Sequence, residues 1–474
     1  MWGSSDPYYN SGVRRTSVWV SMLLLGFAAT LVSRGPAGDP RLRNASRAPE
    51  RNGWIMVRLE GSPAEIGFQH GYLLAPEIED TIKDVAIESA HDEKRDWEFF
   101  RGTARDVFWP RIEREYREEL TGIVEGLHAR NAKLDIWDVV ALNAWLEQSY
   151  YDRSIEAGGA QGASAEHCSA FVATGGYTRD GRIVIGHNNW TSYSSGERWN
   201  IVFDIAPERG NRILMDGMAG MIHSGDDFGV NSAGIVVTET TISGFRGFDP
   251  NGVPEFVRAR KAMQYANSID DFVRIMKDGN NGGYANNWLV ADRKNGEIAS
   301  LELGLKNVAL QRTKDGFFVG SNLPEDPKLI AEETNYDPAD RNLSPNARHQ
   351  RWLDLMARNK GKIDVAAGRN FLADHYDSFE GKFDPDERTL CGHIDLSPRG
   401  VSSWWGPYGL AGTVQSKVTD AAGAERMSFM AALGHSCGLR FKAAPYLRKH
   451  SEFAWTKGIL GDMDSRPWTA FTAR

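Results

Sequence analysis

Alternating apolar and polar residues dominate the chain after residue 167, and they predict β-strands there. Two short apolar runs, Phe171-Val172-Ala173 and Ile183-Val184-Ile185, flank a Thr-Arg-Asp-Gly-Arg turn and are typical of a β-hairpin. Further strands are expected at Ile201–Ile205, Ile213–Met215, Gly234–Thr238, Asn287–Val290, Ile298–Leu303 and Gly316–Val319. No 20–50-residue period repeats, which argues against a solenoid or a propeller.

Helical spacing dominates between Ser62 and about Tyr151. Ser62 is expected to cap the first helix, since a serine hydroxyl there can accept a hydrogen bond from the first turn. Large apolar residues then recur at amphipathic spacing, among them Phe99, Phe100, Val107, Phe108 and Trp109. Later helices are expected at Val253–Tyr265, Ile269–Met276 and Arg348–Arg358.

The N-terminus carries an uncharged apolar stretch from Thr16 to Ser33, preceded by Arg14-Arg15. It is long for the apolar part of a signal peptide and long enough for a membrane helix, so it predicts either an export signal or an uncleaved signal-anchor. We therefore expect a secreted, periplasmic or lysosome-like protein, with possible membrane attachment through residues 16–33. The arginine pair also permits a twin-arginine signal.

Composition and charge narrow the classes of partner. The chain has 474 residues, of which 41% are hydrophobic, so it can bury a large core. Its net charge of -8 leaves no basic surface for nucleic acid, and no nucleic-acid partner is expected. Three cysteines are too few for a disulfide scaffold. Cys391 and Cys437 could pair in an oxidising compartment, or each could be a buried thiol.

Cys168 stands where the first strand of the predicted hairpin begins, directly after His167. If the bond between these two residues is cut, Cys168 gains an α-amine with an ordinary pKa of about 7.7–8.0. Such an amine can act as general base for the neighbouring thiol. The alternative is that Cys168 is a small buried hydrophobic residue, which is the common fate of a strand cysteine.

A series of motifs carries a resemblance to a known family. The motifs span roughly residues 53–330 and are a strand-then-helix opening at 53–75, Glu166-His167-Cys168-Ser169-Ala170-Phe171, Gly186-His187-Asn188-Asn189-Trp190, His223-Ser224-Gly225-Asp226-Asp227-Phe228, Val237-Thr238-Glu239-Thr240-Thr241, Tyr284-Ala285-Asn286-Asn287-Trp288 and Gly320-Ser321-Asn322. With these motifs the chain resembles the phospholipase B-like family of cysteine N-terminal nucleophile hydrolases, which is related to choloylglycine hydrolases and penicillin acyltransferases. The common order of the motifs makes the resemblance specific.

This resemblance implies an α+β fold, a four-layer αββα sandwich with antiparallel sheets face to face. It also implies that Cys168 is the nucleophile and that the chain cleaves itself between His167 and Cys168. His187 stands where choloylglycine hydrolases carry Arg, so charge at that position becomes pH-dependent; the alternative is a core histidine. Asn189 stands where those enzymes carry Asp and can only orient groups by hydrogen bonds.

The resemblance also assigns donors for the oxyanion formed when an acyl bond is attacked. Asn322 matches the position from which relatives aim an amide at that oxygen, although a turn residue before Pro324 would look the same. Thr241 occupies the place of a second donor in choloylglycine hydrolases. Asn286 and Asn287 are explained nearly as well by turn chemistry as by catalysis.

The resemblance also implies a late arginine that fixes charge at the active site. Arg348 and Arg351 fit that role equally from the sequence, and a solvated helix face is the alternative for both. Asp226 and Asp227 could hold a metal ion, but a turn or helix cap is favoured because no ligand is suitably spaced. We expect neither a metal nor a cofactor.

We predict a division of the chain into four segments. These are a signal peptide or signal-anchor at residues 1–35, a flexible linker at 36–52, a helical segment that stays associated after autocleavage at 53–167, and the catalytic αββα domain at 168–474. The expected activity is hydrolysis of an acyl bond, by family name a phospholipid ester. A linear amide hydrolase or an acyltransferase fits the same chemistry, so the substrate partner is a small phospholipid or N-acyl amide. A non-catalytic lipid-binding protein is the alternative of another class.

Overall fold

The computed structural model describes residues 38–155, 167–225, 228–401 and 405–474. By contacts within the chain, residues 32–474 form one compact unit. The apolar stretch 16–33, the Gly/Ala-rich approach to Cys168 and the Asp226-Asp227 pair lie outside the described residues. Within the described ranges, no helix is both long and apolar enough to cross a membrane.

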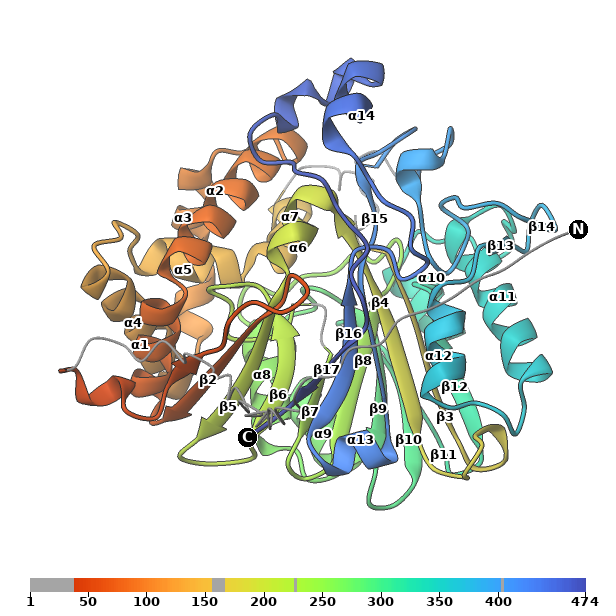
Figure 1. The fold of residues 1–474 in the computed structure, drawn as a ribbon, viewed down its shortest axis with the longest axis horizontal. Helices are drawn as coiled ribbons and strands as arrows, with labels where there is room; N and C mark the ends of the chain where they lie inside the picture. The colour runs from red at the N-terminus through yellow and green to blue at the C-terminus, as the bar shows by residue number, and fades with distance from the viewer. Residues whose placement is uncertain (1–37, 156–166, 226–227, 402–404) are drawn as a thin grey trace, which may run out of the picture. The chain divides into compact units, whose positions relative to one another are not determined.

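Two large sheets form the centre of the fold (Figure 1). The nine-stranded sheet has the order β1 (Ser46–Arg47), β2 (Ile55–Gly61), β5 (Ile201–Pro207), β6 (Ile213–Gly217), β7 (Gly229–Asn231), β8 (Ile235–Thr241), β9 (Asn286–Asp292), β10 (Glu297–Leu303) and β11 (Val308–Thr313). The six-stranded sheet has the order β12 (Gly316–Gly320), β3 (His167–Thr174), β4 (Val184–Ser192), β15 (Ala411–Asp420), β16 (Ser428–Leu433) and β17 (Thr469–Thr472). All neighbouring strands in both sheets are antiparallel except β2 and β5.

The two sheets pack face to face through an apolar layer of their own. Ala170 and Val172 of β3 belong to it, together with Val236 of β8 and Leu289 of β9. Phe171 of β3 belongs instead to a core on the opposite face of the six-stranded sheet. This alternation is what period-two side chains require when both faces of a sheet are buried.

Helices cover the outer face of each sheet, so the layers are αββα, as the resemblance implies (Figure 1). The nine-stranded sheet packs against an apolar core shared with α1 (Pro63–Leu73), α2 (Ala75–Asp92), α3 (Trp97–Thr103), α4 (Arg114–Ala129), α5 (Ile136–Asn143), α6 (Trp145–Ile155), α8 (Glu255–Tyr265) and α9 (Ile269–Lys277). The six-stranded sheet packs against α11 (Ser344–Arg358) and α12 (Val365–Leu372). The remaining α-helices and strands of the described residues are α7 (Tyr193–Arg198), α10 (Pro327–Glu333), α13 (Ala421–Glu425), α14 (Ala443–Lys449) and the small pair β13 (Tyr376–Asp377) and β14 (Lys382–Phe383). Short helices of other types lie between these elements, among them Ile394–Leu396.

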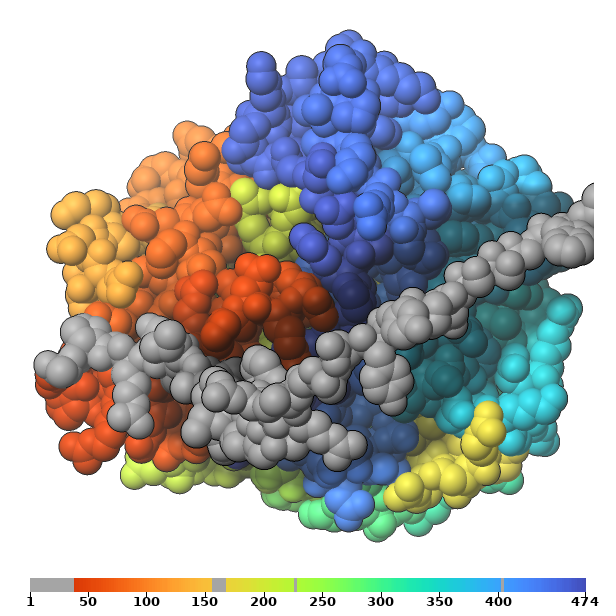
Figure 2. Space-filling view, in the orientation of Figure 1, coloured from red at the N-terminus to blue at the C-terminus, as the bar shows by residue number. Residues whose placement is uncertain are grey.

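The segment before Cys168 is built into this sandwich. Its strand β2 pairs with β5 over seven residues, and its helices form the outer layer of the nine-stranded sheet. Helix α1 begins at the predicted cap, where Ser62 and Glu65 form a capping box. Glycines let α1 and α4 approach closely, because a Cβ on Gly67 would lie 1.9 Å from the carbonyl oxygen of Glu119. In Figure 2 this segment (red and orange) and the C-terminal segment (blue) form one continuous surface.

Candidate active site

Cys168 is buried near the start of β3, with 1% of its surface exposed. It pairs with Asn189 of β4 in the antiparallel register. Because Ala170 and Val172 face the other sheet, the same alternation directs the Cys168 thiol toward the space between the sheets. The thiol therefore lies inside the sandwich, beside the ends of β8 and β9.

Two buried side chains hold the backbone of Cys168 on either side of its Cα atom. The Cys168 amide nitrogen donates to Asn322 Oδ1 at 2.8 Å. The Cys168 carbonyl oxygen accepts a short hydrogen bond from Arg348 Nη1, and Arg348 Nη2 also donates to Asn322 Oδ1 at 3.0 Å. The nitrogen that would become the α-amine after cleavage is thus already fixed.

Asn322 reaches this position from the end of β12, which pairs with β3 up to Gly320. Its backbone adopts a positive φ of 66°, a left-handed conformation that asparagine tolerates better than most residues. Its Nδ2 donates to the carbonyl oxygen of Thr241 at 2.8 Å. A primary amide has a second hydrogen to donate, so the expected oxyanion contact stays a prediction.

Arg348 is the fifth residue of α11 and is fully buried. It donates to Ser344 Oγ, Ser169 Oγ, Asn322 Oδ1 and the Cys168 carbonyl, and all four acceptors are neutral. Its guanidinium stacks on Trp190 at 4.5 Å from the ring centroid. Burial lowers the pKa of Arg348 to about 9, while negative charge on Cys168 or Tyr336 opposes that shift. A buried cation with neutral partners favours a thiolate nearby.

Arg351 does not share this site. Its guanidinium forms a double hydrogen bond with the carboxylate of Asp374, at 2.8 and 2.6 Å. Of the two arginines that the sequence leaves open, the structure places Arg348 at Cys168.

A histidine and a carboxylate lie close to the thiol. One nitrogen of His187, one carboxylate oxygen of Glu239 and Cys168 Sγ all lie within 4.8 Å of one another. Glu239 also accepts a hydrogen bond from Tyr284 Oη at 3.1 Å. The sequence indicated Glu239 only as part of a motif, and its place beside the thiol was not predicted.

The other expected residues lie around this centre in different roles. Asn189 is buried opposite Cys168, and Asn286 is buried opposite Thr241 in the β8–β9 register. Asn287 accepts a hydrogen bond from Ser300 Oγ at 2.8 Å, which is a contact within the sheet.

A pocket that is partly open to solvent lies beside the site. Thr241, the residue held by Asn322, forms part of its wall. Aromatic side chains and carboxylates line much of the rest, including Trp145, Tyr150, Tyr284, Trp405, Glu88 and Asp92. Burial raises the pKa of both these carboxyl groups, so they take up protons more readily than exposed ones.

A second group of side chains meets elsewhere and was missed by the sequence. Cys391 and Cys437 are both thiols and lie with His375 and His393 in one cluster. In this structure the two cysteines are not joined by a disulfide; Cys391 is buried and Cys437 is half-buried.

Two face-to-face sheets between helical layers define an αββα sandwich, and a buried thiol lies near the start of β3, an inner strand of the six-stranded sheet. Comparison with known protein families finds a match to the Phospholipase B family over residues 89–320. The resemblance to phospholipase B-like proteins that the motifs predict is thereby confirmed.

Relatives match over part of their length. A protein of Archaeoglobus fulgidus is 24% identical over 396 residues, covering 75% of this chain and 64% of that protein. Phospholipase B-like 1 of Homo sapiens is 24% identical over 267 residues, covering 49% of this chain and 46% of that protein. These matches therefore span less than two thirds of either relative.

Among solved structures, a mutant conjugated bile acid hydrolase from Clostridium perfringens is similar over 56% of this chain and 88% of its own. Its sequence identity is 10% and its TM-score is 0.32, too low to support an inference about this chain.

Proposed function

We propose that this chain is a hydrolase of acyl bonds that uses Cys168 as its nucleophile after cleaving itself before that residue. The observation that carries the proposal is a pair of hydrogen bonds to the backbone of Cys168. Buried Asn322 accepts from its nitrogen, and buried Arg348 donates to its carbonyl oxygen. A cysteine that served only to fill the core would not need a buried cation among neutral partners, which is costly to maintain. The family match supports a hydrolase.

The chemistry needs no group beyond those of the chain and water. The α-amine of Cys168 takes the thiol proton, and the sulfur attacks the carbonyl carbon of the substrate to form a tetrahedral oxyanion. Asn322 Nδ2, and Thr241 as the second expected donor, stabilise that oxygen. The amine passes its proton to the departing alcohol or amine, leaving a thioester. Water then attacks the thioester, restoring the thiol and releasing a carboxylic acid.

Arg348 contributes by favouring the negative state of Cys168. Its charge is buried, and its acceptors carry no formal charge to neutralise it. A thiolate beside it therefore gains electrostatic stabilisation that solvent does not screen. His187 and Glu239 supply titratable groups within reach of the same sulfur.

The substrate class that we propose is a phospholipid ester, on the family name. The aromatic walls of the pocket offer an apolar surface to an acyl chain, and its carboxylates offer contacts to a polar head group. A linear amide remains the second candidate, because a thiol nucleophile with an oxyanion hole attacks both bonds. An acyltransferase would follow if an amine replaced water in the last step.

We also propose export of the protein, as residues 16–33 suggest. The proposed destination is outside the cytoplasm, in a secreted, periplasmic or lysosome-like setting. Fractionation of cells that express the full chain would test this, with a variant lacking residues 1–35 as the control. Retention of the full chain in the cytoplasm would contradict it.

Intact mass and N-terminal sequencing of purified protein test the mechanism before any substrate is known. We expect a fragment that begins at Cys168, with the N-terminal segment still associated. Cys168→Ser should cleave slowly and lose most turnover, since a hydroxyl is the poorer nucleophile at neutral pH. Full-length wild-type protein with full hydrolase activity would refute self-processing. An uncleaved, inactive protein that binds lipid would favour the non-catalytic alternative.

A further inference from the structure

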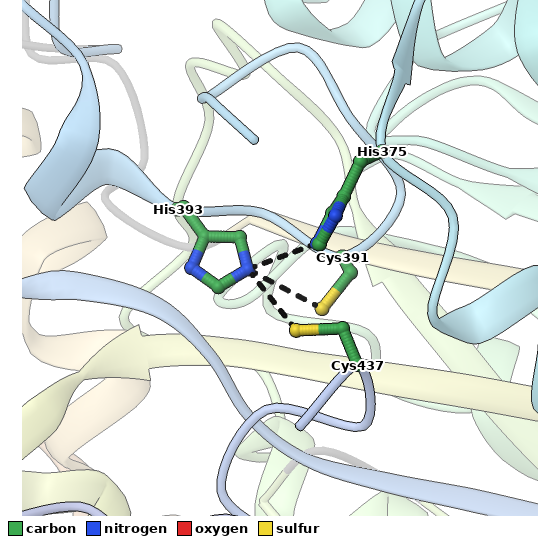
Figure 3. A group of neighbouring side chains, drawn as sticks. All are labelled: His375, Cys391, His393 and Cys437. Atoms are coloured by element: carbon green, nitrogen blue, oxygen red, sulfur yellow. Dashed lines mark hydrogen bonds between the residues drawn. The ribbon is translucent and has the colours of Figure 1, made fainter. Parts of the chain in front are cut away.

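Four side chains from three separate segments converge on one point (Figure 3). His375 follows α12, Cys391 and His393 precede the short helix at 394–396, and Cys437 follows β16. One nitrogen of each histidine and both sulfurs lie within 4.8 Å of one another. None of these residues belongs to the proposed catalytic machinery.

Hydrogen bonding alone does not account for this arrangement. The Nε2 atom of His393 lies 3.2 Å from His375 Nε2, 3.6 Å from Cys391 Sγ and 3.5 Å from Cys437 Sγ. A single imidazole nitrogen offers either one proton or one lone pair, so it cannot satisfy three partners at once. A cation placed between the four atoms would bind all of them together.

The distances fit one kind of ion well. Zn²⁺ binds imidazole nitrogen at about 2.0–2.1 Å and thiolate sulfur at about 2.3 Å, in a tetrahedron. Those bond lengths separate two nitrogens by about 3.4 Å and a nitrogen from a sulfur by about 3.6 Å. The observed separations of 3.2, 3.5 and 3.6 Å follow this pattern. Two sulfur and two nitrogen ligands in a tetrahedron are typical of zinc.

We propose that His375, Cys391, His393 and Cys437 bind one Zn²⁺ ion in a closed structural site. Binding would displace the two thiol protons to solvent and leave an electrically neutral complex of the ion, two thiolates and two imidazoles. With four protein ligands, no coordination position remains for substrate or water, so the role is structural rather than catalytic.

Neighbouring groups support the ligands as a metal site requires. The amide nitrogen of Leu439 donates to Cys437 Sγ at 3.5 Å. A carboxylate oxygen of Asp395 lies 3.9 Å from Nδ1 of His393, on the ring edge away from the cluster. Donors to sulfur stabilise thiolate charge, and a carboxylate beside the second ring nitrogen favours the tautomer that leaves Nε2 open to a metal.

The position of the cluster suggests what the ion would stabilise. Cys391 and His393 flank Gly392, which packs so tightly on Trp190 that a Cβ would lie 2.2 Å from its ring. Trp190 in turn stacks on Arg348. The ion would therefore fix the segment behind the aromatic ring that supports the buried guanidinium. It would do so by joining residues up to 62 positions apart, from 375 to 437.

Metal analysis of the purified full chain tests the site directly. Protein prepared with a thiol reductant and without chelators should hold about one Zn²⁺ per chain, since the ligands are preassembled. Co²⁺ put in its place should give the visible absorption of a tetrahedral thiolate complex. Alkylation of Cys391 and Cys437 should be slow until a chelator is added, and the chelator should lower the melting temperature.

Variants assign the ion to these ligands. Cys437→Ser and His375→Gln should each lose bound Zn²⁺, whereas Cys168→Ser removes a cysteine elsewhere and should retain it. His128→Gln, at an exposed histidine of α4, controls for loss of an imidazole. If a variant of a ligand residue does not fold, the Zn²⁺ content of the wild-type protein still tests the proposal. Reduced wild-type protein that takes up no Zn²⁺ on reconstitution, or native protein with a Cys391–Cys437 disulfide, would overturn the proposal.

Discussion

Asn322 offers a test that separates two roles of one side chain. Its oxygen accepts from the Cys168 nitrogen, and its amide nitrogen donates to the Thr241 carbonyl. Replacement by Ala would confuse the result, because the positive φ of 66° strains any residue with a plain Cβ by about 1–2 kcal/mol. Asn322→Gly removes both contacts without that strain, and Asn322→Asp keeps the acceptor while losing the donor.

The structure sets the size of the expected effects. Asn322→Gly leaves the Cys168 N–H, the Thr241 carbonyl and one Arg348 N–H without their buried partner, and each costs about 1–3 kcal/mol. Asn322→Asp still accepts from Cys168 and Arg348. If the amide also stabilises the oxyanion, both variants should lose about 10²–10³ in kcat with little change in KM.

The assay must use mature, cleaved protein, because slow processing would imitate slow catalysis. Stability should be measured separately on a Cys168→Ala background, in which cleavage cannot occur. If Asn322→Asp keeps near-normal kcat while Asn322→Gly does not, the important contact is the hydrogen bond between the side-chain oxygen at position 322 and the α-amine. The donor to the oxyanion must then be sought at Thr241 or Asn286. If both variants change only KM, neither role is catalytic.

Three further perturbations test other parts of the structure. Arg348→Lys keeps a charge but loses the planar guanidinium that holds Cys168 and Asn322. Two charged hydrogen bonds at about 1.5–3 kcal/mol each predict a fall in kcat of mature protein by about 10²–10⁴-fold; an equal loss in Arg351→Lys would contradict a specific role for Arg348. Burial lowers the pKa of His70 to about 3, so its share of stability is present above pH 6.5 and is lost as pH falls toward 3. At pH 5 this loss is about 2 kcal/mol, and His70→Gln should flatten the decline of melting temperature between pH 7.5 and 5; an unchanged slope would contradict it. Gly67→Ala should cost about 1–3 kcal/mol or more of unfolding free energy, because its Cβ would meet the Glu119 carbonyl, whereas Gly102→Ala meets nothing within 4 Å and should be neutral or stabilising.

Local patterns predicted much of the fold. The hairpin of β3 and β4, the strands β5, β6 and β8 to β10, and the cap at Ser62 follow from period-two alternation, turn residues and capping chemistry. Strand β15 was not predicted. Its residues, from Ala411 to Asp420, are small and polar for a strand, yet nearly all are buried because both faces are covered.

The candidate site could be predicted only where motifs lie close in sequence. Cys168 and Asn322 come from motifs on strands that pair or end side by side, whereas Arg348 and Arg351 stand one helical turn apart and look alike. Only the direction of each side chain separates them. The cluster around His393 was not predicted from the sequence, because its members come from three segments that meet only in the fold. The Cys-x-His and His-x-Cys pairs at 391–393 and 435–437 were the available signal.

The N-terminal segment is part of the sandwich, so the two pieces of a cleaved chain should stay together. Strand β2 is paired within the nine-stranded sheet, and α1 is pressed to α4 at glycines in the layer above. If the bond before Cys168 breaks, the two pieces remain parts of one cooperative unit, and neither keeps a complete core alone. Denaturing gels would show two polypeptides where thermal unfolding shows one transition. The two pieces would then have to be made as one precursor, because the helical layer and the sheets it covers need each other to fold.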